Sequence, residues 1–161
     1  EYGNALLRTL DVVSYVNHAL PNPKNAEPRG CLQVTVKVGG QDVDFLDAHL
    51  GLDAEERAAQ AEAILGWVRT APSVLSGDMN EDVDGGGMQA LLKRLTDAVD
   101  TKSPGKRKQI DHILVSSGVH ILSSRILDTP ESRVASDHLP CLAVLEIGPA
   151  AGNAGENSNK Q

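Results

Sequence analysis

Residues 74–80 read Val-Leu-Ser-Gly-Asp-Met-Asn, a short apolar run that ends in a glycine, an aspartate and an asparagine. The apolar run is typical of a buried strand, and Gly77 marks its end because glycine tolerates the backbone angles of a turn. Asp78 and Asn80 therefore stand at a strand end, where α/β proteins place their functional side chains. Taken alone, each is better explained as an ordinary turn residue.

Three more polar clusters interrupt apolar runs elsewhere in the chain. They are Asp47-Ala48-His49-Leu50, Ile110-Asp111-His112-Ile113 and Ser136-Asp137-His138-Leu139. A carboxylate or imidazole among apolar strand residues must be paired, bound to a metal or exposed at the mouth of a cleft, because burial without a partner is costly. We therefore expect these clusters to converge on one cleft.

The segments between the clusters predict a protein that mixes strands and helices. Strands are expected at residues 5–16, 31–38, 43–49, 74–77, 109–116, 119–127 and 139–147. Gly39 and Gly40 indicate a hairpin between the second and third of these strands. Asp53 and Glu56 resemble a capping box that opens a helix to about Arg69, and residues 88–99 suggest a second helix. This order favours a layered α/β (α+β) sandwich.

The composition fits one globular domain. The chain has 161 residues, of which 40% are hydrophobic, enough for a single core. We expect the domain to span residues 1–147 and residues 148–161 to form a disordered polar tail. The two cysteines, Cys31 and Cys141, lie among apolar or small residues and are interpreted as buried free thiols. No run reaches the roughly 18 apolar residues of a transmembrane helix.

The acidic balance limits how the chain could bind nucleic acid. A formal net charge of −7 argues against a broad basic binding face. A divalent cation in an acidic cluster would reverse the local field, so a nucleic-acid substrate stays open. The basic stretch formed by Lys102 and residues 106–108 is interpreted as a solvated loop, with phosphate contact as the alternative.

In order and approximate spacing, the four clusters resemble the signatures of the endonuclease/exonuclease/phosphatase superfamily, the DNase I-like hydrolases. Residues 2–7, 27–30 and 56–62 resemble supporting segments of the same family, so the resemblance covers roughly residues 1–147. It implies a DNase I-like sandwich and a phosphoesterase that depends on Mg²⁺ or Mn²⁺. The implied partner is a phosphoester substrate: nucleic acid, a phosphoinositide, sphingomyelin or another small phosphoester.

The resemblance also implies catalytic roles. Asp78 would orient or deprotonate the attacking water, and Asn80 would contact a phosphoryl oxygen. His138 would donate to the scissile phosphate, with Asp111 fixing its tautomer, and His49 would be a second donor. A satisfied histidine at a strand end is the alternative interpretation of His49.

The same resemblance implies metal ligands. Asp137 would be a direct or outer ligand of the cation, and Asp78 and Asn80 would complete the carboxylate and amide oxygens that Mg²⁺ prefers.

His112 follows Asp111, so strand alternation points it to the opposite face and predicts a structural role.

The chain departs from the family pattern in three places. Ala48 replaces a threonine and Met79 replaces an aromatic residue, which leaves the polar groups unchanged. The family's N-terminal half, with a metal-binding glutamate, has no counterpart in this chain. We therefore expect an exposed apolar surface and little hydrolysis by the chain alone. The alternative is a non-catalytic remnant or binding module of the same fold.

Overall fold

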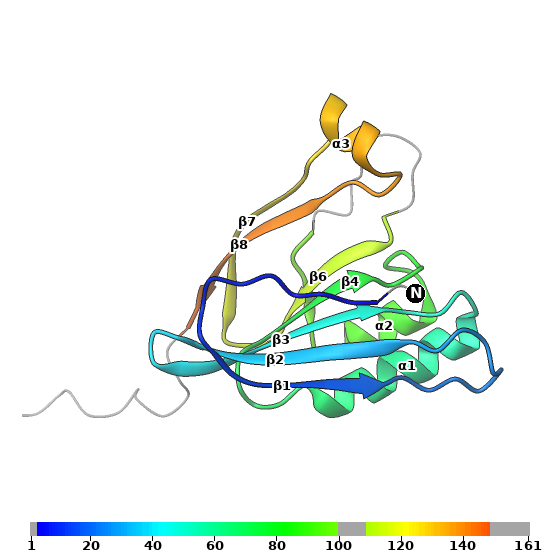
Figure 1. Cartoon of the computed structure of the whole chain (residues 1–161), viewed down its shortest axis with the longest axis horizontal. Helices are drawn as coiled ribbons and strands as arrows, with labels where there is room; N and C mark the ends of the chain where they lie inside the picture. The colour runs from blue at the N-terminus through cyan, green and yellow to red at the C-terminus, as the bar shows by residue number, and fades with distance from the viewer. Residues whose placement is uncertain (1–2, 100–108, 149–161) are drawn as a thin grey trace, which may run out of the picture.

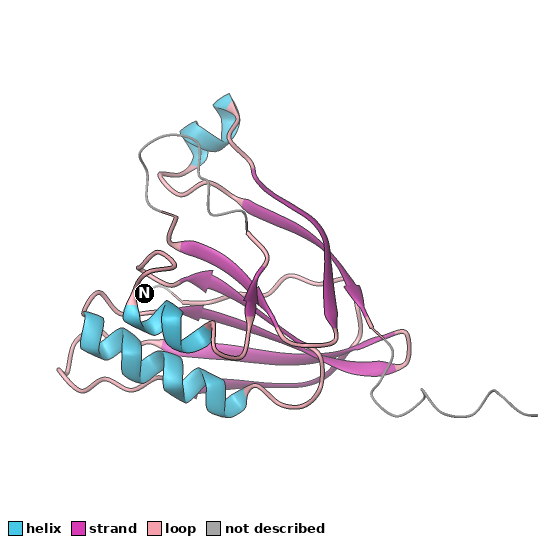
Figure 2. Ribbon diagram, turned by 180° about the vertical axis from the view of Figure 1, so that it is seen from behind, coloured by secondary structure: helices cyan, strands magenta, loops and turns pink. Residues whose placement is uncertain are grey.

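The computed structural model describes residues 3–99 and 109–148, which form two sheets and three helices. Helices α1 and α2 cover one face of the larger sheet, and the smaller sheet leans against the other (Figures 1 and 2). The elements are β1 (Val12–Ala19), β2 (Gly30–Val38), β3 (Gln41–His49), α1 (Ala54–Trp67), β4 (Ser73–Asp78), α2 (Gly86–Leu91), β5 (Thr96–Asp97), β6 (Asp111–Val115), β7 (Val119–Ile126), α3 (Pro130–Ala135) and β8 (Cys141–Ile147).

The larger sheet has six strands in the order β1-β2-β3-β4-β6-β5, and the smaller sheet pairs β7 with β8. Strands β3 and β4 are parallel and joined by α1, whereas the other pairs are antiparallel. This mixture of helices and strands confirms the predicted α/β class. It also brings the ends of β3 and β4 to the same edge of the sheet.

Local signals explain the best-predicted elements. Gly39 and Gly40 have φ of 57° and 87°, the left-handed values that the hairpin between β2 and β3 requires. Asp53 caps α1 by accepting from the backbone N–H groups of Glu55 and Glu56. The predicted capping box is only half formed, because Glu56 does not reach back to Asp53: its carboxylate accepts from the Gln60 amide at 2.9 Å.

Two hydrophobic cores hold the layers together. Leu46, Ala48 and Leu50 belong to the core beneath α1 and α2. On the other face of the sheet, Phe45 and Val115 pack in the core that also holds β8. Alternation along β3 therefore gives each face its own core, and His49 shares the face of Phe45.

The N-terminal strand prediction was partly wrong. The strand begins at Val12, and residues 3–11 form no strand but run across the open face of the sheet (Figure 1). Asn4 fixes this segment by donating to the backbone carbonyls of Gly30 and Asp47 at 3.0 and 2.7 Å. Side-chain anchoring, which no periodicity reveals, thus replaces ladder pairing here.

The second helix is shorter than predicted. Helix α2 ends at Leu91, and Thr96 and Asp97 form β5, which pairs with β6. The apolar spacing at residues 88–95 is compatible with a full helix, so tertiary pairing decided the outcome. Helix α3 was not predicted, although its capping box of Thr129 and Ser132 is a readable start signal.

The remaining predictions on organisation are mixed. Both cysteines are free thiols; Cys31 is buried, which raises its pKa to about 12, whereas Cys141 is only half-buried. In residues 3–99 and 109–148, no helix is long and apolar enough to span a membrane. The basic stretch at residues 102–108, and residues 149–161 of the tail predicted at 148–161, lie outside the described residues, so both predictions remain untested.

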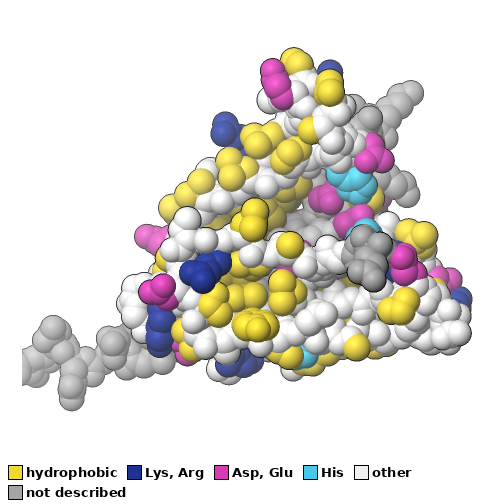
Figure 3. Space-filling model, viewed as in Figure 1, with side chains coloured by type: hydrophobic (Ala, Val, Ile, Leu, Met, Phe, Trp, Pro, Cys, Tyr) yellow, Lys and Arg dark blue, Asp and Glu magenta, His cyan; other side chains and the backbone are white. Residues whose placement is uncertain are grey.

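An apolar surface is exposed, as expected. Tyr15 and Val13 on β1 are 76% and 52% exposed, and Leu122 on β7 and Val144 on β8 are 61% and 49% exposed. Figure 3 shows hydrophobic side chains gathered over the small sheet and the adjoining sheet face. Residues 6–10 border an apolar hollow together with Val36 and Phe45.

Candidate functional site

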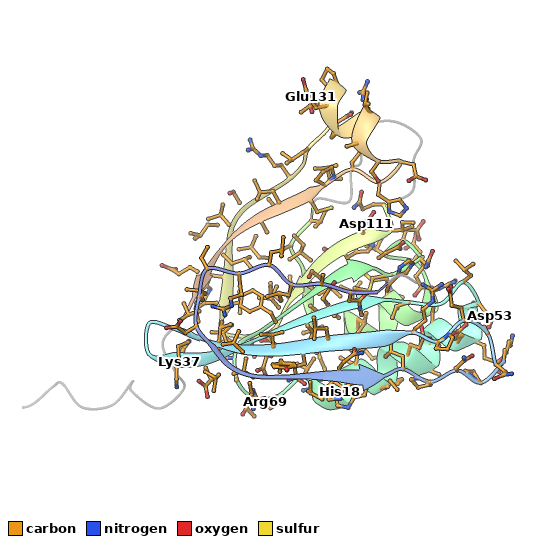
Figure 4. The ribbon with its side chains drawn as sticks, viewed as in Figure 1. His18, Lys37, Asp53, Arg69, Asp111 and Glu131 are labelled. Atoms are coloured by element: carbon orange, nitrogen blue, oxygen red, sulfur yellow. The ribbon has the colours of Figure 1, made fainter. Side chains whose placement is uncertain are left out.

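Three neighbouring strands bring their polar residues to one edge of the larger sheet. In the parallel pair β3 and β4, His49 lies opposite Asp78, and in the antiparallel pair β4 and β6, Asp78 lies opposite Asp111. The three side chains share the sheet face that is free of helices. Figures 3 and 4 show histidine and acidic side chains at this end, with Asp111 labelled.

Gly77 permits this arrangement. Its φ is 144°, and a Cβ at this position would overlap the Ala48 carbonyl oxygen on β3. Any larger residue would push the two strands apart at the point where they present His49 and Asp78. The side chains of Ala48 and Met79 are buried in the core on the helix side. The two departures from the family pattern therefore change packing and leave the polar edge intact.

His138 reaches the site from the segment between α3 and β8. Its Nδ1 lies 2.8 Å from an Asp111 carboxylate oxygen and 4.0 Å from Oδ2 of Asp78. Nε2 of His49 lies 3.3 Å from the same Asp78 oxygen. Two carboxylates and two imidazoles thus surround one point, and the predicted contact between Asp111 and His138 is present.

Asn80 is held in the loop that follows β4. Its backbone N–H donates to Oδ1 of Asp78 at 2.8 Å, and its side-chain amide donates to the Leu50 carbonyl at 2.7 Å. Its φ is 53°, a left-handed value that is uncommon for a non-glycine residue. These bonds fix both Asn80 and one oxygen of Asp78.

The site is electrostatically uneven. Burial alone would lower the pKa of His138, but the hydrogen bond and charge of Asp111 raise it above its ordinary value, helped by Asp78 and Asp137. Burial and the nearby cations Arg29 and His138 lower the pKa of His49. Burial, with the negative charge of Asp78, raises the pKa of Asp111. His138 is therefore the ring that favours the cationic form.

The described side chains offer one group that suits a cation. Asp78, Asp111 and His138 each supply a ligand atom, and these atoms lie within 4.8 Å of one another. Adjacent carboxylates repel, and a divalent cation between them would remove that repulsion. Asp137 is exposed, beside His138 and outside this group.

Sequence reasoning did not propose Asp111 or His138 as metal ligands. The register of β4 against β6 sets Asp111 beside Asp78, and this register cannot be read from the sequence. Strand alternation did predict the place of His112, which is buried on the helix side of β6. Its ring contacts Asp97 at 2.7 Å and the Glu81 carbonyl at 3.2 Å.

The fold is shared with solved structures of low sequence identity. The mannosyl-6-phosphatase Bt3783 of Bacteroides thetaiotaomicron VPI-5482 is 22% identical with a TM-score of 0.71, covering 86% of this chain and 67% of its own. The human Nocturnin catalytic domain, solved with a bound sulfate anion, is 20% identical with a TM-score of 0.73, and the match covers 86% of this chain and 60% of the Nocturnin chain. TDP2 of D. rerio, complexed with a single-strand DNA product, is 16% identical with a TM-score of 0.66, and the match covers 85% of this chain and 68% of the TDP2 chain.

This chain therefore spans only 60% to 68% of the length of these three solved chains. No curated protein sequence matches it significantly. The family model described as "Endonuclease/Exonuclease/phosphatase family" matches residues 1–138, which include His49, Asp78, Asp111 and His138. The chain belongs to the endonuclease/exonuclease/phosphatase family.

Proposed function

We propose that this chain carries most of the active site of a divalent-metal-dependent phosphoesterase. One observation carries the proposal: Asp78, Asp111 and His138, which are distant in sequence, form a compact cluster at a sheet edge in a member of this family. The reaction is hydrolysis of a phosphodiester or phosphomonoester by an activated water.

Mg²⁺ or Mn²⁺ is the cofactor that the donor set fits. Asp78 and Asp111 supply carboxylate oxygens, which hard divalent cations prefer, and Asp137 and Asn80 are additional candidate ligands. When bound, such a cation lowers the pKa of a coordinated water and neutralises charge on the phosphate.

Asp78 is suited to orient the attacking water. Its Oδ1 accepts the Asn80 N–H, so Oδ2 is the oxygen directed toward the imidazoles. A carboxylate fixed at one oxygen presents the other in a defined direction, which favours general-base work. The side-chain oxygen and amide of Asn80 provide further polar contacts for a phosphoryl group.

His138 is suited to bind the charged phosphate. Asp111 engages Nδ1, which leaves the Nε2–H group to donate to a non-bridging oxygen. The raised pKa favours the cationic form of this ring, and in that form it is a donor to phosphate and not a metal ligand. His49, whose pKa is lowered, would act near neutral pH as an uncharged donor.

The substrate class is supported only at a coarse level. The solved relatives include a protein called a mannosyl-6-phosphatase and another complexed with a DNA product, so one fold accommodates both small phosphomonoesters and nucleic acid. The net charge of −7 and the four aromatic residues favour a small or lipid-like phosphoester, or a nonspecific nuclease activity.

We further propose that another polypeptide segment completes the site. The chain spans about two thirds of the length of a solved relative, and β1, β7 and β8 expose apolar side chains. Such a segment would cover that surface and add a carboxylate to the metal site. The short coverage also supports an alternative, a non-catalytic binding module of the same fold.

The test compares this chain with a longer protein that contains it. Hydrolysis of p-nitrophenyl phosphate and bis(p-nitrophenyl) phosphate is measured with Mg²⁺, Mn²⁺ or EDTA. We expect EDTA-sensitive turnover from the longer protein, its loss in Asp78→Asn, and little turnover from the 161-residue chain. A longer protein without turnover on any phosphoester would support the binding module. Full turnover by the chain alone would contradict the need for another segment.

A further inference from the structure

His112 links two segments that approach the site from the helix side of the sheet. It lies on β6 directly after Asp111, but its ring is 1% exposed and points away from the cluster. Nδ1 meets an Asp97 carboxylate oxygen at 2.7 Å, and Nε2 meets the Glu81 carbonyl at 3.2 Å. Both partners are acceptors, so the ring bridges β5 and the loop after β4.

Glu81 is the best-anchored residue of that loop. Besides the contact from His112 to its carbonyl, its carboxylate accepts from the Met88 backbone at 2.6 Å and from Nε of Arg57 at 2.8 Å. It directly follows Asn80, whose φ of 53° is a left-handed value that few non-glycine residues adopt. The anchors on Glu81 act next to this residue, so they restrain the turn at Asn80.

On the side of the cluster, the loop is held by the Met79 N–H, which donates to the Ile110 carbonyl at 2.8 Å, and by Asn80. Asn80 itself bonds to Asp78 and to the Leu50 carbonyl, so any shift of the loop moves the bond that fixes Oδ1 of Asp78. The chain of contacts therefore runs from Asp97 through His112 and Glu81 to Asn80 and Asp78.

We propose that His112, held by Asp97, is a positioning residue that fixes Asn80 and the Asp78 carboxylate through the Glu81 carbonyl. The proposal rests on the proposed function for its catalytic consequence, but the positioning itself can be measured without activity. It differs from a general contribution to the core, because it depends on one donor, Nε2, directed at one carbonyl.

Two amide substitutions separate the two bonds of the ring. In His112→Gln, the amide nitrogen can take the place of Nε2 and keep the Glu81 bond. In His112→Asn, it can take the place of Nδ1 and keep only the Asp97 bond. Both remove the ring from the same core position, so they are matched controls for lost packing.

The first measurement is the amide NMR spectrum of the 161-residue chain. We expect His112→Asn to shift the Asn80 and Glu81 backbone resonances and His112→Gln to leave them close to those of the wild type. If His112→Asn does not fold, Asp97→Asn is the second variant, and it should shift the same resonances less. Unchanged Asn80 resonances in all folded variants, or equal shifts in both His112 variants, would overturn the proposal.

The second measurement is kinetic, in a form that hydrolyses a phosphoester. We expect kcat to fall by about 10-fold in His112→Asn with KM nearly unchanged, and to stay within about twofold in His112→Gln. Equal losses in both variants would overturn the proposal. If no form is active, the proposed function fails, whereas the NMR comparison still decides the positioning role.

Discussion

Strand β3 carries two charged sites of opposite character near its two ends. Asp44, near its start, is fully buried and accepts from Arg69, from Thr35 at 2.7 Å and from Gln33 at 3.2 Å. His49, at its end, joins the half-exposed cluster of Asp78 and Asp111. Figure 4 labels Arg69 and Asp111, which mark these separate ends of the sheet.

The difference between the sites is how their charges are satisfied. Burial would raise the pKa of Asp44, but the donors around it, Arg69 above all, lower it below its ordinary value. Asp111 instead keeps a raised pKa, because burial and the charge of Asp78 outweigh its bond to His138. A carboxylate whose partners all come from the chain stabilises the fold, whereas carboxylates set against each other are available for a cation and substrate.

The largest expected effect is on turnover at the Asp78 end. In a form that hydrolyses a phosphoester, Asp78→Asn and His138→Ala should each reduce kcat by about 10² to 10⁴-fold, because each removes a group that acts on water or phosphate. Steady-state kinetics with Mg²⁺ or Mn²⁺ measures this. Near wild-type turnover in either variant would refute that residue's role.

The next effect is on stability at the Asp44 end. Arg69→Met should lower the free energy of unfolding by about 1 to 2 kcal/mol at neutral pH, because Asp44 loses its cation but keeps the donors Thr35 and Gln33, and water partly screens the half-exposed Arg69. Urea denaturation measures the change. The double variant Asp44→Asn/Arg69→Met should recover part of the loss, and a double variant no more stable than Arg69→Met would show that packing by the Arg69 stem causes it.

The contrast also shows what sequence could and could not predict. The polar residues of the site were found because each interrupts an apolar strand in a family-like order, and alternation placed His112 correctly. The pairing of Asp111 with Asp78 was not predicted, because register between β4 and β6 depends on tertiary structure. The partnership of Asp44 with Arg69, 25 residues apart, left no local signal either. The end of α2 was likewise set by the pairing of β5 with β6.

Acid should remove the contribution of Asp44. A carboxyl group with a lowered folded pKa stabilises the fold fully above its ordinary pKa of 3.8 and loses this contribution as pH falls through the folded value. We therefore expect the difference in unfolding free energy between wild type and Asp44→Asn to be constant from about pH 5 to about pH 7 and to shrink below pH 3.8. A difference that does not depend on pH would mean that the Asp44 charge adds nothing to stability.

The smallest expected effect is on stability at the Asp78 end. Asp78→Asn should change the free energy of unfolding by less than about 0.5 kcal/mol, or raise it slightly, because it removes a like charge beside Asp111 while its amide oxygen can still accept the Asn80 N–H. Thermal unfolding without metal tests this, and Asp111→Asn is the comparison, since it also removes the ionic partner of His138. Added Mn²⁺ should raise the Tm of the wild type more than that of Asp78→Asn, because a ligand that binds only the folded state stabilises it in proportion to its affinity. A loss above about 1.5 kcal/mol in Asp78→Asn would place this carboxylate with Asp44 among the groups that hold the fold together.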